Sequence, residues 1–221
     1  MKNKENDIVK NKEKKSSEKI IFIVLAVIVV GLMLWFIING SIINKIVINQ
    51  RTNMSVGNFS YTIELENTTD NSKKVVNKIY YKDGIKMYVM QNNGRDLILW
   101  NNENTNEKIY LVPSILKATV EKDANKELND IPYLIDEYTS RTMKLSSIIT
   151  SDIVDGEECY KINNLGLKLW YSKSTGMIVK AINGAEEEEN ATKFKNWQFD
   201  NLEDEDVTRP NLEGYEIASN K

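Results

Sequence analysis

Side chains able to do chemistry are scarce in this sequence, which contains no histidine and one cysteine. The absence of histidine removes the commonest general base near neutral pH, the usual zinc ligand and any Ser-His or Cys-His nucleophile. Cys159 follows Glu157 and Glu158 in a segment typical of a β-strand, and negative neighbours raise a thiol pKa and lower its reactivity. We therefore interpret Cys159 as a structural residue, and most familiar hydrolase mechanisms are excluded.

Two acidic runs, residues 186–189 and 203–206, raise the hypothesis of a calcium site. Neither run has the glycine-interrupted spacing of oxygen ligands of an EF-hand loop, so we interpret them as a solvated hairpin tip and a solvated tail. An enzyme would need a Ser/Lys or carboxylate pair, and these residue types are too abundant for the sequence to single out one pair. We predict no catalytic residue, no metal and no cofactor.

Nineteen consecutive uncharged residues begin at Ile20 and end at Ile38. As a helix they would be roughly 28 Å long, which is close to the thickness of the hydrocarbon core of a bilayer. Seven lysines and four acids precede the run, so the excess of positive charge places the amino terminus in the cytoplasm. The sequence thus predicts a single-pass anchor in the cell membrane, with an extracytoplasmic domain behind it.

Two alternatives to an uncleaved anchor fit the sequence less well. A cleaved secretory signal has an apolar region of about 7–15 residues and a small-x-small cleavage site. Here the apolar run is longer, and Asn39, Gly40 and Ser41 follow it. A lipid-modified amino terminus would need a cysteine directly behind the run, and the only cysteine is Cys159. We therefore expect the helix itself to hold the protein in the membrane.

The sequence divides into a disordered basic tail (1–19), the anchor (20–39), a juxtamembrane linker (40–57) and one extracytoplasmic domain (58–221). Within the linker, residues 41 to about 52 are expected to form a short helix. Beyond the tail and anchor there are 22 basic and 28 acidic residues, a balance that argues against a nucleic-acid partner. One cysteine forms no intramolecular disulfide, so the core alone must hold the domain.

Alternation of apolar and polar residues predicts most of the outer domain as β-sheet. In residues 58–66 (NFSYTIELE) every second residue is apolar, which is typical of a strand with one buried face. Segments rich in β-branched and aromatic residues follow, separated by turn signals such as Asp83-Gly84. Similar segments resume after residue 147, with turns at Asp155-Gly156 and Thr175-Gly176. We predict nine or ten strands in an antiparallel meander.

A helical insertion interrupts this pattern between residues 114 and 147. Asp130 followed by Pro132 signals a helix start, and an irregular helical piece is expected at about 115–128. The residues that share one face of the predicted helix are Ile131, Leu134, Ile135 and Tyr138. The predicted fold class is α+β: one large curved antiparallel sheet, an incomplete β-barrel, with helices on one face and one amino-terminal transmembrane helix. The final acidic segment, with Pro210 and Gly214, is expected to be a loop.

Two hairpins and the closing segment resemble a known family. Residues 155–162 (DGEECYKI) and 169–180 (LWYSKSTGMIVK) are similar to the hairpins DG-x-x-CY-x-I and W-[FY]-D-x-x-TG-L-P-x-K of the LolA-like superfamily. Residues 199–215 resemble the closing strand and D-E-D-F-x-x-P tail of the same group. The sequence departs from these motifs at three positions, where Ser172 replaces Asp, Ile178 replaces Pro and Val207 replaces an aromatic residue.

The resemblance implies an incomplete barrel around an apolar cavity that helices close, and in carrier members of the superfamily this cavity shelters acyl chains. It does not imply carriage between two membranes, because a protein held by its own helix cannot shuttle. It implies a lipid or an acylated protein as partner. The alternative is an envelope sensor or protein-interaction module without a bound lipid, as regulators of the same superfamily are.

The candidate cavity lining consists of large apolar residues from the first half of the sheet. These residues are Phe59, Tyr61, Ile63, Leu65, Met87, Val89, Leu97 and Leu99. The competing interpretation is a core filled by its own side chains under the helix. Both faces of the segments 85–90 and 97–100 carry large side chains, so something must cover more than one surface. A bound chain, the helix or a protein partner would each serve.

Overall fold

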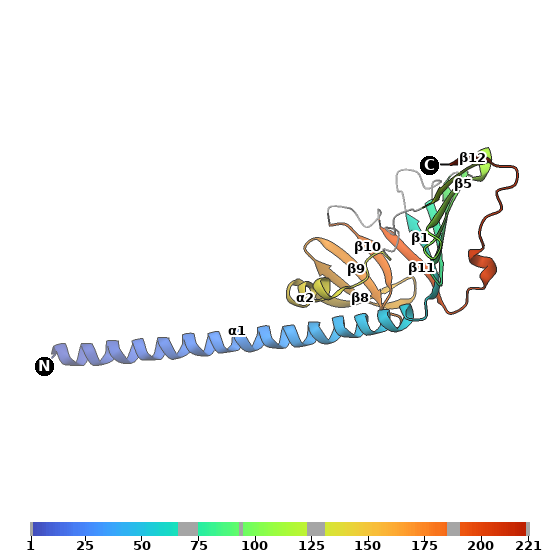
Figure 1. Cartoon of the computed structure of the whole chain (residues 1–221). Coiled ribbons are helices and arrows are strands. Elements are labelled where there is room, and N and C mark those ends of the chain that lie inside the picture. The colour runs from blue at the N-terminus through green and yellow to red at the C-terminus, as the bar shows by residue number, and fades with distance from the viewer. Residues whose placement is uncertain (1, 66–74, 93–94, 123–130, 185–190, 220–221) are drawn as a thin grey trace. The chain divides into compact units, whose positions relative to one another are not determined.

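The computed structural model describes residues 2–65, 75–92, 95–122, 131–184 and 191–219, and the chain forms two compact units, 1–42 and 43–221 (Figure 1). Helix α1 (Lys2–Met54) runs through both units. It therefore includes residues that the sequence assigns to a tail and to a separate juxtamembrane helix. Among the described helices, α1 is the one long and apolar enough to cross a membrane, within Lys19–Met54.

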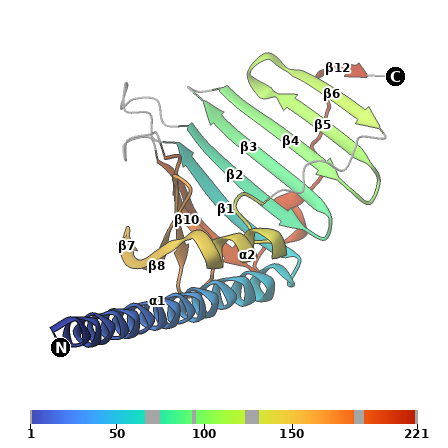
Figure 2. The ribbon, with the colours of Figure 1, turned by 90° about the vertical axis from the view of Figure 1, so that its left-hand side faces the viewer.

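The second unit is built on one mixed sheet of twelve strands within the described residues (Figure 2). In sequence order the strands are β1 (Asn58–Leu65), β2 (Val75–Lys82), β3 (Ile85–Asn92), β4 (Arg95–Asn102), β5 (Glu107–Val112), β6 (Lys117–Lys122), β7 (Ile148–Val154), β8 (Glu157–Asn164), β9 (Leu167–Ser172), β10 (Ile178–Ile182), β11 (Thr192–Phe199) and β12 (Glu216–Ser219). Their spatial order is β12-β6-β5-β4-β3-β2-β1-β11-β10-β9-β8-β7. The sheet does not close, which confirms the predicted α+β fold with a large curved sheet.

The sequence prediction is wrong for two strands near one edge of the sheet. β6 lies where an irregular helical piece is expected, and only the 3₁₀ turn η1 (Pro113–Ile115) precedes it; residues 123–128 of that piece lie outside the described residues. β12 lies in the segment predicted as a closing loop, and it pairs with β6 in parallel, so the sheet is mixed. β12 (EIAS) has no clear alternating pattern, whereas in β6 the apolar Ala118 and Val120 alternate with polar residues, a signal that the sequence prediction missed.

The sheet has an inner face, which carries Phe59 and Tyr61, and an outer face, which carries Ser60 and Thr62. Because side chains alternate along a strand, the register of each strand pair assigns every other residue to one of these faces. In Figure 1 the strands β8 to β10 and β1 to β5 lie at an angle to each other, so the sheet curves around its inner face. Different parts of the chain pack on the two halves of the inner face, β7 to β11 and β1 to β5.

Helical segments cover the inner face of β7 to β11. They are residues 43–54 of α1, here called the docked segment, and α2 (Glu137–Ser146). Ile43, Ile46 and Met143 are buried in this layer. Removing such side chains from water stabilises the fold by roughly 25 cal/mol per Å² of apolar surface. This half of the inner face is therefore a filled core.

The predicted helix start at Asp130 is wrong for the described residues, because α2 begins at Glu137. Residues 131–136 form turns and extended backbone, and Tyr133 has a left-handed φ of +58°. The Asp136 carboxylate accepts a hydrogen bond from the Thr139 amide at 2.6 Å and caps the helix there. Tyr138 consequently lies on the solvent side of α2, not on the apolar face predicted for it.

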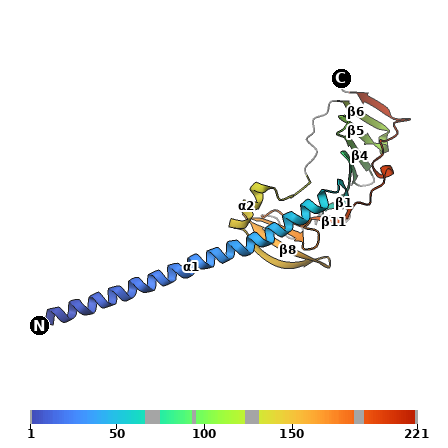
Figure 3. The ribbon, with the colours of Figure 1, turned by 60° about the horizontal axis from the view of Figure 1, so that its bottom comes forward.

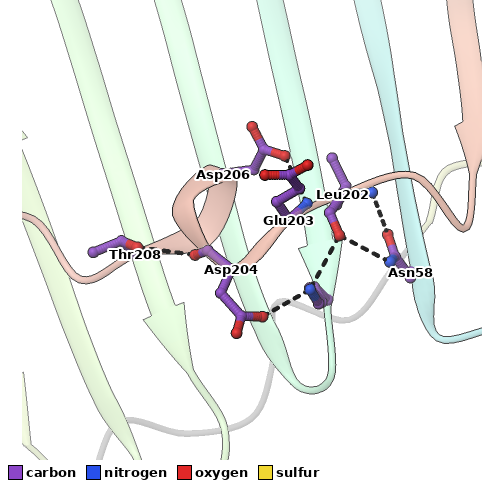
Figure 4. Close-up of polar contacts among 7 residues, drawn as sticks. Asn58, Leu202, Glu203, Asp204, Asp206 and Thr208 are labelled. Carbon is purple, nitrogen blue, oxygen red and sulfur yellow. Dashed lines mark hydrogen bonds and ion pairs between the residues drawn. The ribbon is translucent and has the colours of Figure 1, made fainter.

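On the outer face, residues 200–215 form a C-terminal strap that crosses β1 to β5 (Figure 4). The strap contains the 3₁₀ helix η3 (Asp204–Val207), and the Val207 carbonyl accepts a hydrogen bond from Trp100 Nε1 at 2.8 Å. Lys82 Nζ donates to the Leu202 carbonyl at 3.0 Å and lies 2.7 Å from Asp204. The hydrogen bond from Lys82 lowers the pKa of Asp204. Three of the four acids in the run 203–206 are exposed, as predicted, and the run 186–189 lies outside the described residues. The strap also covers a core cluster, against which its Leu212 and Tyr215 pack: Trp100, Ile109, Leu111 and Ala118.

Three amide side chains of the docked segment bind the β9–β10 turn. Asn49 Nδ2 donates to the Ser174 carbonyl at 3.1 Å, Gln50 Nε2 to the Gly176 carbonyl at 3.0 Å, and Asn53 Nδ2 to the Thr175 carbonyl at 2.8 Å. Gln50 Oε1 also accepts from the Ile135 amide at 3.1 Å. The bond to the Gly176 carbonyl is buried and satisfies an acceptor that would otherwise lack a partner, whereas the bond to the Ser174 carbonyl is exposed. The docked segment is therefore part of the second unit.

Replacement of Gly176 tests this docking. Gly176 has φ +73°, and a Cβ there would lie 2.6 Å from the Ile46 carbonyl oxygen and 2.8 Å from the Asn49 Cβ. We expect Gly176→Ala to lose stability through left-handed strain, worth about 1–2 kcal/mol, and through the clash, worth about 1–3 kcal/mol. The measurement is thermal or denaturant unfolding of the full chain in detergent.

Gly156→Ala is the matched control. Gly156 has φ +89° in the β7–β8 turn, and no atom lies within 4 Å of the position that a Cβ would take, so this variant carries the strain without the clash. Equal losses in the two variants would show that the docked segment yields to the extra methyl group and contributes no rigid contact.

Candidate functional site

A ladder of aromatic rings crosses the inner face at the centre of the sheet. The rings of Tyr61 and Trp197 stack with centroids 4.1 Å apart, Phe59 and Tyr81 lie 5.0 Å apart, and Phe59 and Tyr61 lie 6.4 Å apart. The register of β1 and β11 shifts between Ser60 and Thr62, and this irregularity brings Trp197 opposite Tyr61. The ladder forms a continuous apolar wall from β11 to β2.

Six of the eight predicted lining residues share the inner face. β1 contributes Phe59, Tyr61, Ile63 and Leu65, and β4 contributes Leu97 and Leu99 through its pairing with Met90 and Tyr88. Phe59 and Tyr61 are buried, whereas the β4 residues are half-buried. The structure therefore brings these six side chains to one surface.

Met87 and Val89 lie on the outer face, and their assignment to the same lining is wrong. Met87 pairs with Tyr80 and Trp100, and it packs against the cluster under the C-terminal strap. An offset of one residue in a strand moves a side chain to the opposite face. The inner face of β3 carries instead Tyr88 and Met90. The two-residue turn at Asp83-Gly84, which pairs Lys82 with Ile85, is the sequence signal that predicts this register.

A pocket of about 240 Å³ opens at one end of this inner surface. Its lining residues are Met54, Gly57, Phe59, Tyr81, Lys86 and Ile131. Five of these six contribute no formal charge, and the sixth, Lys86, has only 1% of its surface exposed. The Lys86 ammonium lies 4.9 Å from the centre of the Tyr88 ring, a cation–π distance. The pocket thus combines an aromatic wall with one buried cationic side chain.

Two buried polar atoms on the inner face have no hydrogen-bond partner among the residues that the structure describes. They are the Tyr61 hydroxyl and the Asn77 side-chain carbonyl. Burial raises the pKa of Tyr61, and the nearby Tyr88 raises it further. The Tyr61 hydroxyl therefore stays protonated and can donate a hydrogen bond. Leaving such groups unpaired costs free energy, which a ligand with a polar group beside its apolar part would recover.

Cys159 is a structural residue, as the sequence predicts. It is fully buried in a cluster with Trp170 and Val179, and its thiol donates to the Glu157 carbonyl at 3.4 Å. Burial and the charge of Glu157 raise the pKa of Cys159 to about 11. A protonated, buried thiol is a poor nucleophile. No cluster of three or more metal-ligating side chains occurs among the described residues.

No family model matches the chain, and no curated protein matches its sequence. Among solved structures, the chain is similar to an uncharacterized conserved protein from Thermus thermophilus, with a TM-score of 0.49, 8% identity, and coverage of 80% of this chain and 98% of that one. It is also similar to a LolA superfamily protein from Nitrosomonas europaea, with a TM-score of 0.31, 9% identity, and coverage of 77% and 97%. That superfamily is the one whose hairpin motifs this sequence resembles.

Replacement of two buried tyrosines tests whether the Tyr61 hydroxyl is unpaired. We expect Tyr61→Phe to leave stability unchanged or raise it by up to about 1 kcal/mol, because no hydrogen bond is lost. Tyr171→Phe is the comparison, since the Tyr171 hydroxyl donates to the Tyr133 carbonyl at 3.0 Å and its loss should cost about 1 kcal/mol. Denaturant unfolding of both full-length variants measures the difference. A loss for Tyr61→Phe as large as that for Tyr171→Phe would contradict the assignment.

Proposed function

We propose that this protein is a membrane-anchored extracytoplasmic binding protein for an apolar or acylated ligand, such as a lipid or the acyl chain of a lipoprotein. The observation that carries the proposal is the inner face of β1 to β4, where an aromatic wall, a pocket and an unpaired buried hydroxyl occur together. Ligand sites typically combine a mainly apolar lining with a few polar groups that orient the ligand.

Differences between the two halves of the inner face support this assignment. Over β7 to β11 the docked segment and α2 fill the face with side chains such as Ile43, Ile46 and Met143. Over β1 to β4 the inner residues Leu65 and Met90 remain 41% and 38% exposed, and Leu97 and Leu99 are half-buried. An acyl chain lying on this surface would gain roughly 0.8 kcal/mol for each methylene group that it buries.

The membrane anchor determines where the protein would bind such a ligand. The apolar stretch of α1 and the lysine-rich residues before it support a single-pass topology, with the amino terminus in the cytoplasm and residues 43–221 outside. A domain held in this way stays beside one membrane, so it would bind its ligand locally. Binding an apolar ligand on the inner face requires no catalytic group. We therefore assign the protein a binding role and not an enzymatic one.

Photo-crosslinking tests the ligand site. The probe is palmitic acid carrying a diazirine, added to the full chain in lipid nanodiscs and followed by peptide mapping. We expect adducts in peptides from β1 to β4 as well as in the membrane span. Met90→Glu should reduce the β1 to β4 adducts several-fold, because it places a charge on the inner face.

Gln91→Glu is the matched control, because the adjacent residue adds the same charge on the outer face of the same strand. It should leave the adducts unchanged. Adducts confined to residues 20–38, or equal losses in the two variants, would contradict the proposed site and favour a protein-interaction module without a lipid ligand.

A further inference from the structure

Large apolar side chains are exposed at one corner of the outer domain. Tyr138, Leu145, Ile148 and Leu165 each have between 56% and 88% of their surface exposed. Below, these four residues are called the apolar corner. Soluble domains tolerate single exposed apolar residues, but a group of them marks a contact surface.

Hydrogen bonds and strand pairing hold the apolar corner together. Ser146 Oγ lies 3.1 Å from Asn164 Oδ1, which joins the end of α2 to the end of β8, and Ile148 pairs with Asn163. Leu145 and Leu165 are the chain neighbours of the two bonded residues, so the backbone at three of the four positions meets at this junction. By the register of β7 and β8, Ile148 lies on the outer face at this edge of the sheet. Tyr138 lies seven residues before Leu145 and hence on the same side of α2.

The length of the tether argues for the membrane as occupant of this surface. The apolar run ends at Ile38, and the compact outer domain begins at Ile43. The four residues between them span about 6 Å as a helix and about 14 Å when fully extended. The outer domain therefore remains at the membrane surface.

The docked segment fixes the point at which the chain enters the outer domain. Its bonds to the β9–β10 turn fix its direction within the domain. Figures 1 and 3 both show α2 nearer to the beginning of the docked segment than to its end. The apolar corner thus lies on the side of the domain from which the chain continues to the anchor.

Two basic residues lie beside the apolar corner. Arg141 and Lys144 lie on α2 between Tyr138 and Leu145, although Arg141 also pairs with Glu137. Basic residues beside exposed Leu, Ile and Tyr side chains are typical of helices that lie in the interfacial region of a bilayer. Tyrosine is itself favoured at that level, because its ring is apolar and its hydroxyl is polar.

We propose that the apolar corner inserts into the headgroup region of the bilayer that holds α1, and that this contact orients the outer domain on the membrane. The proposal rests on the membrane anchor of the proposed function but not on the ligand. It gives the outer domain a second attachment, separate from the span.

Spin-label accessibility in lipid nanodiscs tests the contact. Single nitroxides are placed at Leu145→Cys, Ile148→Cys and Leu165→Cys in the full chain, with Cys159→Ala as background, because Cys159 is the only native cysteine. The probe pair is molecular oxygen, which concentrates in lipid, and a water-soluble nickel complex. We expect the ratio of oxygen to nickel accessibility at these three sites to be several-fold higher than at sites exposed to water.

Two sites provide the matched aqueous control, and one provides the lipid control. Ile115→Cys and Ile217→Cys carry equally exposed apolar positions, at 58% and 52%, near β6 and β12 at the other edge of the sheet. Leu25→Cys lies in the predicted span.

Aqueous values at the corner with a lipid value at Leu25 would overturn the contact and leave the anchor intact, whereas an aqueous value at Leu25 would overturn the anchor itself. Spin–spin broadening confined to the corner would show a second copy of the chain there, and would also overturn the proposal.

Discussion

The hydrogen bonds between the docked segment and the β9–β10 turn are the interaction on which the rest of this structure depends. Gln50 contributes most, because its side chain donates to the Gly176 carbonyl and accepts from the Ile135 amide. One buried side chain thereby joins the helix to the sheet and to the chain that leads into α2. The close approach also requires glycine at position 176, where a Cβ would meet the helix backbone. Without these bonds, buried carbonyls and amides on three elements would lose their partners.

This docking divides the inner face of the sheet into two regions. Helices fill the region over β7 to β11, so its residues are an ordinary core. The region over β1 to β4 retains half-buried and partly exposed apolar side chains next to Phe59 and Tyr61. A sheet of this width would otherwise leave both halves open to solvent, which costs too much hydrophobic free energy for a stable domain. The same contact therefore stabilises the fold and leaves the apolar surface over β1 to β4 without a cover from the described helices.

On the outer face, a segment of mostly irregular chain and not an α-helix covers the apolar side chains. The strap from residue 200 to residue 215 covers Trp100 and its neighbours with backbone and a few apolar side chains, and its acids remain in water. The Arg209 guanidinium forms two hydrogen bonds with the Glu107 carboxylate, at 2.8 and 3.1 Å, and lowers the pKa of Glu107. An acidic segment can thus be both solvated and structural, which composition alone does not reveal.

The sequence by itself determined the features that depend on local periodicity: the apolar helix, ten of the strands, their hairpin turns, and the absence of histidine chemistry. Only the tertiary structure decided that Met87 lies on the outer face, that α2 begins at Glu137, and that β6 pairs with the end of the chain. It also decided the partners of Asn49, Gln50 and Asn53, which lie more than 120 residues away in the sequence. Strand periods and turns are encoded in neighbouring residues, whereas the pairing of distant segments depends on how well whole surfaces pack and satisfy each other's polar groups.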